Sequence, residues 1–142
     1  KIPMNLKIER VVIPGNYEWT KLNNKYHSFD DKPAYYDVDS IWYKYGRKHR
    51  DNNLPAFISI DKLMTWMKEG KIHRDNLPAE VDYDEIRYYQ NGLLHRDGGL
   101  PAIIHIDGGK EWYLHGVLQR KDFSHKLEDP LTIVVLYALH AI

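Results

Sequence analysis

A triplet of side chains that can each take part in catalysis, His-Arg-Asp, recurs at nearly equal spacing along the chain. It opens a longer motif, His-Arg-Asp followed by Leu-Pro-Ala, which begins at His49, His73 and His95. Histidine exchanges protons near neutral pH, arginine binds anions, and aspartate orients hydroxyl groups or binds metal ions. The candidate residues are therefore His49, His73, His95, Arg50, Arg74, Arg96, Asp51, Asp75 and Asp97.

Catalysis is the first use to consider for this triplet, because protein kinases carry His-Arg-Asp in their catalytic loop. The chain has no glycine-rich phosphate loop and no Asp-Phe-Gly, and its 142 residues are far fewer than a kinase needs. An active site also requires one convergent set of groups, whereas here the triplet stands in three equivalent places. We expect no catalytic residue and no enzymatic activity.

Metal binding is the second use, and the expected spacing of the motifs argues against it. If each repeat adds two strands, equivalent histidines lie roughly 10 Å apart. Two ligands of one zinc ion must lie within about 4 Å of each other. One ion cannot bridge two repeats, and the pair His and Asp within a repeat makes a weak site. We therefore expect no metal and no cofactor, and a structural role for the triplets as ion pairs and turn caps between repeats.

The glycines and aromatic residues define the repeat that carries these triplets. Gly46, Gly70, Gly92 and Gly116 are separated by 22 or 24 residues, and each lies four residues after Trp42, Trp66, Tyr88 or Trp112. Each glycine and the residue before it are placed to form a two-residue hairpin turn. A second extended run follows each Leu-Pro-Ala, as in residues 56–60, 79–83 and 102–106, and its alternate apolar positions share one face.

Each strand before the turn holds two adjacent large residues, which must face opposite sides of the sheet. The two sets are Trp42, Trp66, Tyr88 and Trp112, and Tyr43, Met67, Tyr89 and Tyr113. Either set can face the core, and the other then forms a stripe on the opposite face. We take the Trp set and the isoleucines of the second run as the core, and the His-Arg-Asp-Leu-Pro-Ala segment as a clasp between repeats.

The ends of the chain differ from the repeats, so we divide the sequence into three parts. Residues 1–18 are expected to be an N-terminal strand or cap, and residues 123–142 a C-terminal cap or dimerisation segment. Asp129-Pro130 is typical of a helix start, and residues 131–142 carry no charge, although the β-branched run 132–135 leaves a strand as the alternative. The repeats between the ends are 19–39, 40–63, 64–85, 86–109 and 110–122.

The spacing from the aromatic residue to glycine and then histidine resembles the MORN repeat, over about residues 19–122. The usual His-Gly-x-Gly is replaced here by His-Arg-Asp-x-x-Leu-Pro-Ala, a variant similar to arrays that giant double-stranded DNA viruses of amoebae encode in many copies. The resemblance implies an all-β repeat fold, an elongated antiparallel sheet of tandem β-hairpins with the apolar C-terminal segment as its cap. It also implies contacts with proteins, often by self-association, and a role at membrane lipids has been proposed for the wider family.

Composition limits the partners further. The chain has 20 Lys and Arg against 20 Asp and Glu, so it lacks the basic excess that drives nucleic-acid binding, and it has no cysteine. It also lacks an apolar stretch of about 20 residues that could cross a membrane. We expect an intracellular protein, in host cytoplasm or virion if viral, neither secreted nor transmembrane. The leading prediction is that the chain is a non-enzymatic scaffold and forms a homodimer. The alternative is that it binds phospholipid headgroups through the aromatic face. The expected dimer contacts, which exchange of the C-terminal segment could make, are Leu131, Val134, Val135, Tyr137, Leu139 and Ile142.

Overall fold

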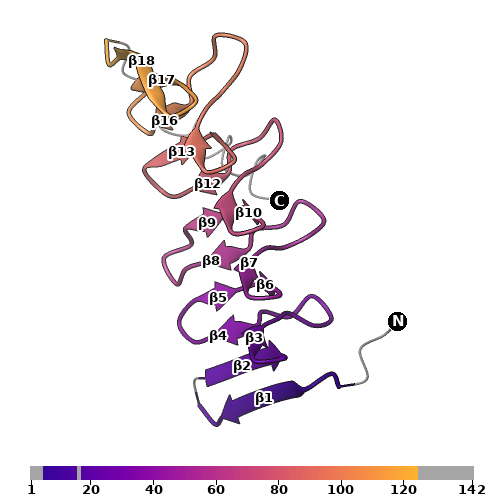
Figure 1. Cartoon of the computed structure of the whole chain (residues 1–142). Coiled ribbons are helices and arrows are strands. Elements are labelled where there is room, and N and C mark those ends of the chain that lie inside the picture. Colours follow the sequence, from indigo (N-terminus) through magenta and orange to yellow (C-terminus); the bar gives the residue numbers. More distant parts are fainter. Residues whose placement is uncertain (1–4, 16, 125–142) are drawn as a thin grey trace.

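The chain forms a ladder of antiparallel strands, seen in a computed structural model that describes residues 5–15 and 17–124 (Figure 1). Twelve strands form one sheet in the order β1-β2-β4-β5-β8-β9-β12-β13-β16-β17-β18, and β3 pairs with β2. No helix occurs in the described residues. The strands of this main sheet are β1 (Ile8–Ile13), β2 (Tyr17–Leu22), β3 (Lys25–Tyr26), β4 (Tyr35–Tyr36), β5 (Ser40–Ile41), β8 (Phe57–Ile58), β9 (Met64–Thr65), β12 (Glu80–Val81), β13 (Glu85–Arg87), β16 (Ile103–His105), β17 (Lys110–Leu114) and β18 (Val117–Asp122).

Three further two-stranded hairpins lie beside the main sheet, so an interior repeat contains two hairpins and not the single one expected. They are β6 (Tyr43–Lys44) with β7 (Arg47–Lys48), β10 (Met67–Lys68) with β11 (Lys71–Ile72), and β14 (Tyr89–Gln90) with β15 (Leu93–Leu94). The aromatic residue of the repeat joins the two hairpins. The backbone N–H of Trp66 donates to Ala79 O at 2.8 Å, which continues the pairing of the main sheet. The backbone carbonyl of Trp66 accepts from His73 N–H at 3.0 Å, which closes the short hairpin.

The short-hairpin turns fall where the glycine spacing predicts them. Tyr45 has φ 50° and Gly46 φ 84°, and the three later turns have the same signs, as a type I′ turn requires. A side chain at Gly46 would be strained at this positive φ. The first repeat uses Asn23 and Asn24, with φ 47° and 64°, because asparagine is among the residues that tolerate positive φ best after glycine.

The core follows the Trp set of aromatic residues. Trp42, Trp66 and Tyr88 are buried, whereas Trp112, near the end of the ladder, is half-buried. Four alanines that follow the loop prolines are fully buried, where a larger side chain would find no room. They are Ala34, Ala56, Ala79 and Ala102. Val81, Ile86 and Ile103 complete the buried apolar set.

Two expectations for the faces of the sheet are wrong. The second aromatic set, Tyr43, Met67, Tyr89 and Tyr113, does not form an exposed stripe, because all four side chains are half-buried and two of them pack against the core. The isoleucine set is not uniformly core either. Ile58 is half-buried, but Ile60 is 67% exposed and Tyr83, its equivalent, is 71% exposed, because these positions lie in turns beyond the strands.

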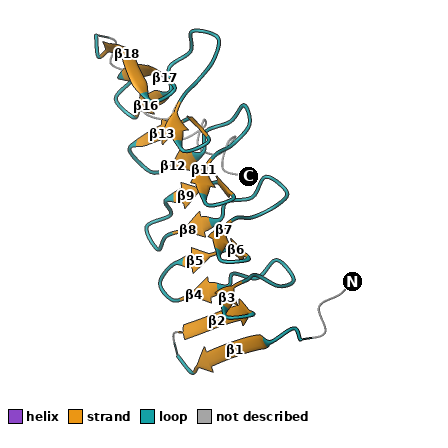
Figure 2. Ribbon diagram, viewed as in Figure 1, coloured by secondary structure: helices purple, strands orange, loops and turns teal. Residues whose placement is uncertain are grey.

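Both ends of the ladder are longer hairpins. The expected N-terminal strand is β1, which pairs with β2 over six residues, and Asn23 N–H donates to Lys7 O at 2.8 Å. At the other end β18 runs straight along β17, with a register shift at Trp112/Tyr113. The last repeat therefore lacks the protruding loop that the other repeats show (Figure 2). The helix expected over residues 131–142 lies outside the described residues.

Candidate functional site: the clasp between repeats

The histidine of each loop joins its own repeat to the next one. Its Nδ1 accepts a hydrogen bond from the first turn residue of the following short hairpin. The four bonds are Tyr45 N–H to His27 at 3.1 Å, Glu69 N–H to His49 at 3.1 Å, Asn91 N–H to His73 at 3.0 Å and His115 N–H to His95 at 3.0 Å. Because Nδ1 is an acceptor, the neutral ring carries its proton on Nε2.

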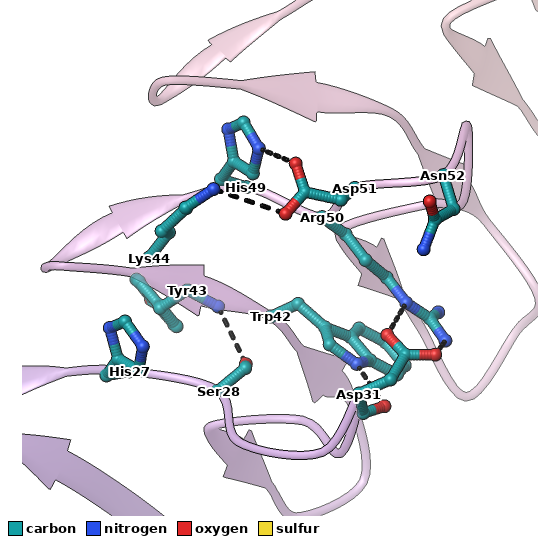
Figure 3. Close-up of a pocket in the computed structure, with 10 residues that line it drawn as sticks. All are labelled: His27, Ser28, Asp31, Trp42, Tyr43, Lys44, His49, Arg50, Asp51 and Asn52. Atoms are coloured by element: carbon teal, nitrogen blue, oxygen red, sulfur yellow. Dashed lines mark hydrogen bonds and ion pairs between the residues drawn. The ribbon is translucent and has the colours of Figure 1, made fainter.

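The aspartate of the triplet accepts a hydrogen bond from this Nε2–H group. The distances from Nε2 to the carboxylate Oδ1 are 2.8 Å for His49 and Asp51, 3.0 Å for His73 and Asp75, and 3.0 Å for His95 and Asp97. The bond from His49, followed by one from Lys44, lowers the pKa of Asp51 below its usual range. Figure 3 shows both bonds meeting at Asp51. The aspartate thus fixes the ring orientation that the next repeat requires.

The arginine of the triplet stacks on the aromatic residue of its own repeat. The guanidinium carbon lies 3.8 Å from the ring centre in Arg50 and Trp42, 3.9 Å in Arg74 and Trp66, and 3.7 Å in Arg96 and Tyr88. The last repeat, which has lost histidine and Leu-Pro-Ala, keeps the stack between Arg120 and Trp112 at 3.8 Å. Such contacts are worth about 0.5 to 2 kcal/mol, depending on burial.

The first repeat provides an internal comparison for this stack. Thr20 stands in the aromatic position, where its N–H donates to Ala34 O at 2.8 Å as the equivalent Trp42 N–H donates to Ala56 O. Ser28 stands in the arginine position. The ring and the guanidinium are therefore both absent from the same repeat and both present in the other four, which indicates that they act as one unit.

The arginine and tryptophan side chains also reach the preceding loop. Arg50 makes two bonds of 2.8 Å to the carboxylate of Asp31, and Arg74 Nε donates to Asn53 Oδ1 at 2.7 Å. The indole N–H groups donate to loop carbonyls: Trp42 to Asp31 at 2.9 Å, Trp66 to Asn53 at 2.8 Å and Trp112 to Gly99 at 2.9 Å. Burial lowers the pKa of Arg74 to about 10, and Arg50 lowers that of Asp31.

Asp31 and Asn53 also belong to the clasp, although the repeated motif does not include them. Both stand two positions before the loop proline, where Asp or Asn is ordinarily a turn residue. They do adopt positive φ, 55° and 56°, but that conformation also presents their carbonyl groups to the next indole. This position holds Asp or Asn in the first three loops and Gly99 in the fourth, where the carbonyl group still accepts the Trp112 indole N–H.

Shallow grooves separate consecutive loops and are lined mainly by these same residues. Two of these grooves have volumes of about 290 and 390 Å³. Figure 3 shows the first, in which Arg50 lies over Trp42 and reaches Asp31, and His49 turns toward Asp51. Within residues 5–15 and 17–124, no group of three or more His, Cys, Asp or Glu side chains could hold a metal ion. The candidate residues therefore meet in pairs, His with Asp and Arg with the aromatic ring, and these pairs lie where one repeat contacts the next.

A second polar cluster, absent from the sequence expectations, lies on β13, β16 and β17. His105 faces two carboxylates, with Nδ1 2.7 Å from Glu85 and Nε2 3.0 Å from Glu111. Burial alone would raise the pKa of Glu111, but bonds from Lys121, His105 and Tyr113 outweigh it and lower the value. This cluster joins the last repeats through side chains of three neighbouring strands.

Comparison of the chain with protein-family models, with curated proteins and with solved structures found no match. The described part of the chain contains no helix that is long and apolar enough to cross a membrane. The expected dimer contacts, Leu131, Val134, Val135, Tyr137, Leu139 and Ile142, lie outside the described residues.

Proposed function

We propose that this chain is a non-enzymatic scaffold, a variant MORN-like array that presents a long rigid surface for protein contacts and associates with itself. One observation carries the proposal: the His-Arg-Asp side chains of successive copies make the same contacts, and those contacts hold one repeat against the next. Side chains that make such contacts fix each repeat against its neighbour along the array. Stability built from neighbouring units is the property that repeat scaffolds use to display extended surfaces.

Self-association is assigned to the two ends of the ladder. β1 and β18 are the end strands of the main sheet in the described residues, so each has one side without a strand neighbour. Exposed strand edges favour pairing with another chain unless something covers them. The uncharged segment 131–142 is the part of the sequence best suited to cover such an edge, in its own chain or in a second copy.

Light scattering on the full chain and on a version ending at Asp129 tests this assignment. We expect a dimer for the full chain and a monomer for the shortened one, with an unchanged β-sheet circular dichroism spectrum. A full-length monomer at all concentrations would contradict self-association. A dimer that survives the truncation would exclude the C-terminal segment as the assembly element and leave the sheet edges to account for it.

A further inference from the structure

Within the main sheet, consecutive strands are joined by turns between β4 and β5, β8 and β9, β12 and β13, and β16 and β17. These turns carry a row of mostly exposed apolar side chains on the side away from the His-Arg-Asp loops. Val38 is 61% exposed, Ile60 67% and Tyr83 71%, and Ile106, the next equivalent residue, is half-buried. Each is the fourth residue after a buried alanine, so the row has the period of the repeat. We call residues 37–39, 59–62, 82–84 and 106–107 the turn ridge.

Hydrogen bonds join the first turn of the ridge to the second, and the third turn to the fourth. Ile60 N–H donates to Asp39 Oδ1 at 3.0 Å, and Ile106 N–H donates to Asp84 O at 2.6 Å. Within one turn, Asp82 Oδ1 accepts from the N–H groups of Asp84 and Glu85 at 2.8 and 2.9 Å. The apolar side chains are thus held at fixed intervals. Two strands per repeat at about 4.8 Å each set that interval at roughly 10 Å.

The ridge is also acidic. Its carboxylates are Asp37, Asp39, Asp61, Asp82, Asp84 and Asp107, and its one basic residue is Lys62. Among ion pairs between described residues, only Asp82 of these six takes part, with Arg87 at 3.8 Å. The other five carboxylates leave their charge available to a partner. Such a surface repels anionic lipid and nucleic acid and attracts a basic partner.

We propose that the turn ridge docks a basic protein segment that carries an apolar side chain at every third position. A polyproline II segment has three residues per turn and a rise of about 3.1 Å, so every third residue lies on one face at intervals of about 9.3 Å. That interval matches the spacing of Val38, Ile60 and Tyr83. Lysine or arginine beside each apolar residue then faces the aspartates. This inference rests on the proposed scaffold function and names its partner.

The test is fluorescence anisotropy of the full chain with a labelled peptide of four Lys-Pro-Leu units, at low and at moderate salt. We expect saturable binding that weakens as salt screens the aspartates. Two control peptides are an acidic one of Glu-Pro-Leu units and one of the same composition with leucines at irregular intervals, and both should bind at least tenfold more weakly. No binding at low salt, or equal binding of the irregular peptide, would overturn the proposal.

Variants of the chain locate the site. Ile60→Ser combined with Tyr83→Ser should weaken binding by about tenfold or more, because two apolar anchors are lost. The change Asp61→Asn with Asp84→Asn should weaken it and reduce its salt dependence. Val117→Ser alters a side chain that is 62% exposed on β18, away from the ridge, and should leave binding unchanged. Equal binding by the ridge variants would overturn the assignment.

The same samples separate this proposal from the scaffold proposal. All ridge side chains named in the variants are exposed, so the variants should keep the melting temperature of the native chain. Light scattering then reports self-association independently of peptide binding. A dimer that does not bind the peptide overturns the ridge partner alone, whereas a monomer that binds it overturns self-association alone.

Discussion

The two nitrogens of the loop histidine have different roles, and at His27 this difference makes the junction sensitive to pH. Nδ1 accepts the N–H of the next turn, so it must stay unprotonated, whereas Nε2 donates to an aspartate where one is present. In the first repeat Phe29 stands in the aspartate position, and its ring lies 4.9 Å from the His27 ring. Burial, followed by the charge of Lys44, lowers the pKa of His27 below its usual value of 6.5.

We therefore expect the free energy of unfolding to fall as the pH is lowered below about 6.5. A histidine whose folded pKa is depressed contributes stability above its unfolded pKa, and this is lost as the pH falls through the folded value. Urea unfolding between pH 7.5 and 4.5 measures the effect. His27→Asn keeps an oxygen acceptor near the Nδ1 position and does not titrate, so its stability should depend less on pH. An unchanged pH profile in this variant would contradict the role of His27.

The aromatic residue and the arginine that covers it form the structural element that joins sheet, short hairpin and preceding loop. Trp66 illustrates this, because it is only 3% exposed, lies under Arg74 and donates its indole N–H to Asn53 O. Removing the ring leaves a cavity in the core and a guanidinium without its apolar platform. The cost of such a change is not confined to one repeat, because the indole bond to Asn53 O joins the ring to the preceding repeat.

Trp66→Ala should lower the free energy of unfolding by about 3 to 5 kcal/mol, the usual range for removing a buried large aromatic side chain. Chemical denaturation followed by far-ultraviolet circular dichroism measures it. Trp112→Ala is the matched control, since this ring has the same arginine stack but is half-buried at the end of the array, and it should cost clearly less. Equal losses in the two variants, or an unchanged melting temperature for Trp66→Ala, would refute the core assignment.

The sequence predicts the short-hairpin turns better than it predicts the short strands of the second hairpin and the turns between them. The short-hairpin turns follow directly from the glycine spacing and are confirmed by positive φ, as at Asn91 and Gly92. The second hairpin of each repeat was missed because several of its strands are only two residues long, too short for alternation to reveal. The exposure of Ile60 has a different cause, since the apolar alternation continues from the strand into an exposed turn.

The clasp shows a similar limit. Its histidine, arginine and aspartate are evident from repetition alone, which also argues for a structural role over a catalytic one. Which atoms meet is not evident, because Asp31 and Asn53 contact a repeat that begins several residues later. Such pairings depend on the path of the loop, and the sequence shows only the residues at its two ends.

At the scale of the whole molecule, the described residues form a stack of strands whose interior junctions are nearly interchangeable. A stack of this kind should accept an extra unit, because each new repeat meets neighbours that offer the same contacts. We predict that inserting a second copy of residues 66–87 directly after Arg87 gives a folded protein that is longer by two strands, about 10 Å. Small-angle X-ray scattering measures the length, and urea unfolding should show equal or higher stability.

A control insertion with Trp66→Ala and His73→Ala in the added copy lacks the ring and the acceptor that form a junction, and it should be less stable than the native chain. An intact insertion that leaves the maximum dimension unchanged would mean that the added unit loops out and that the junctions are not interchangeable.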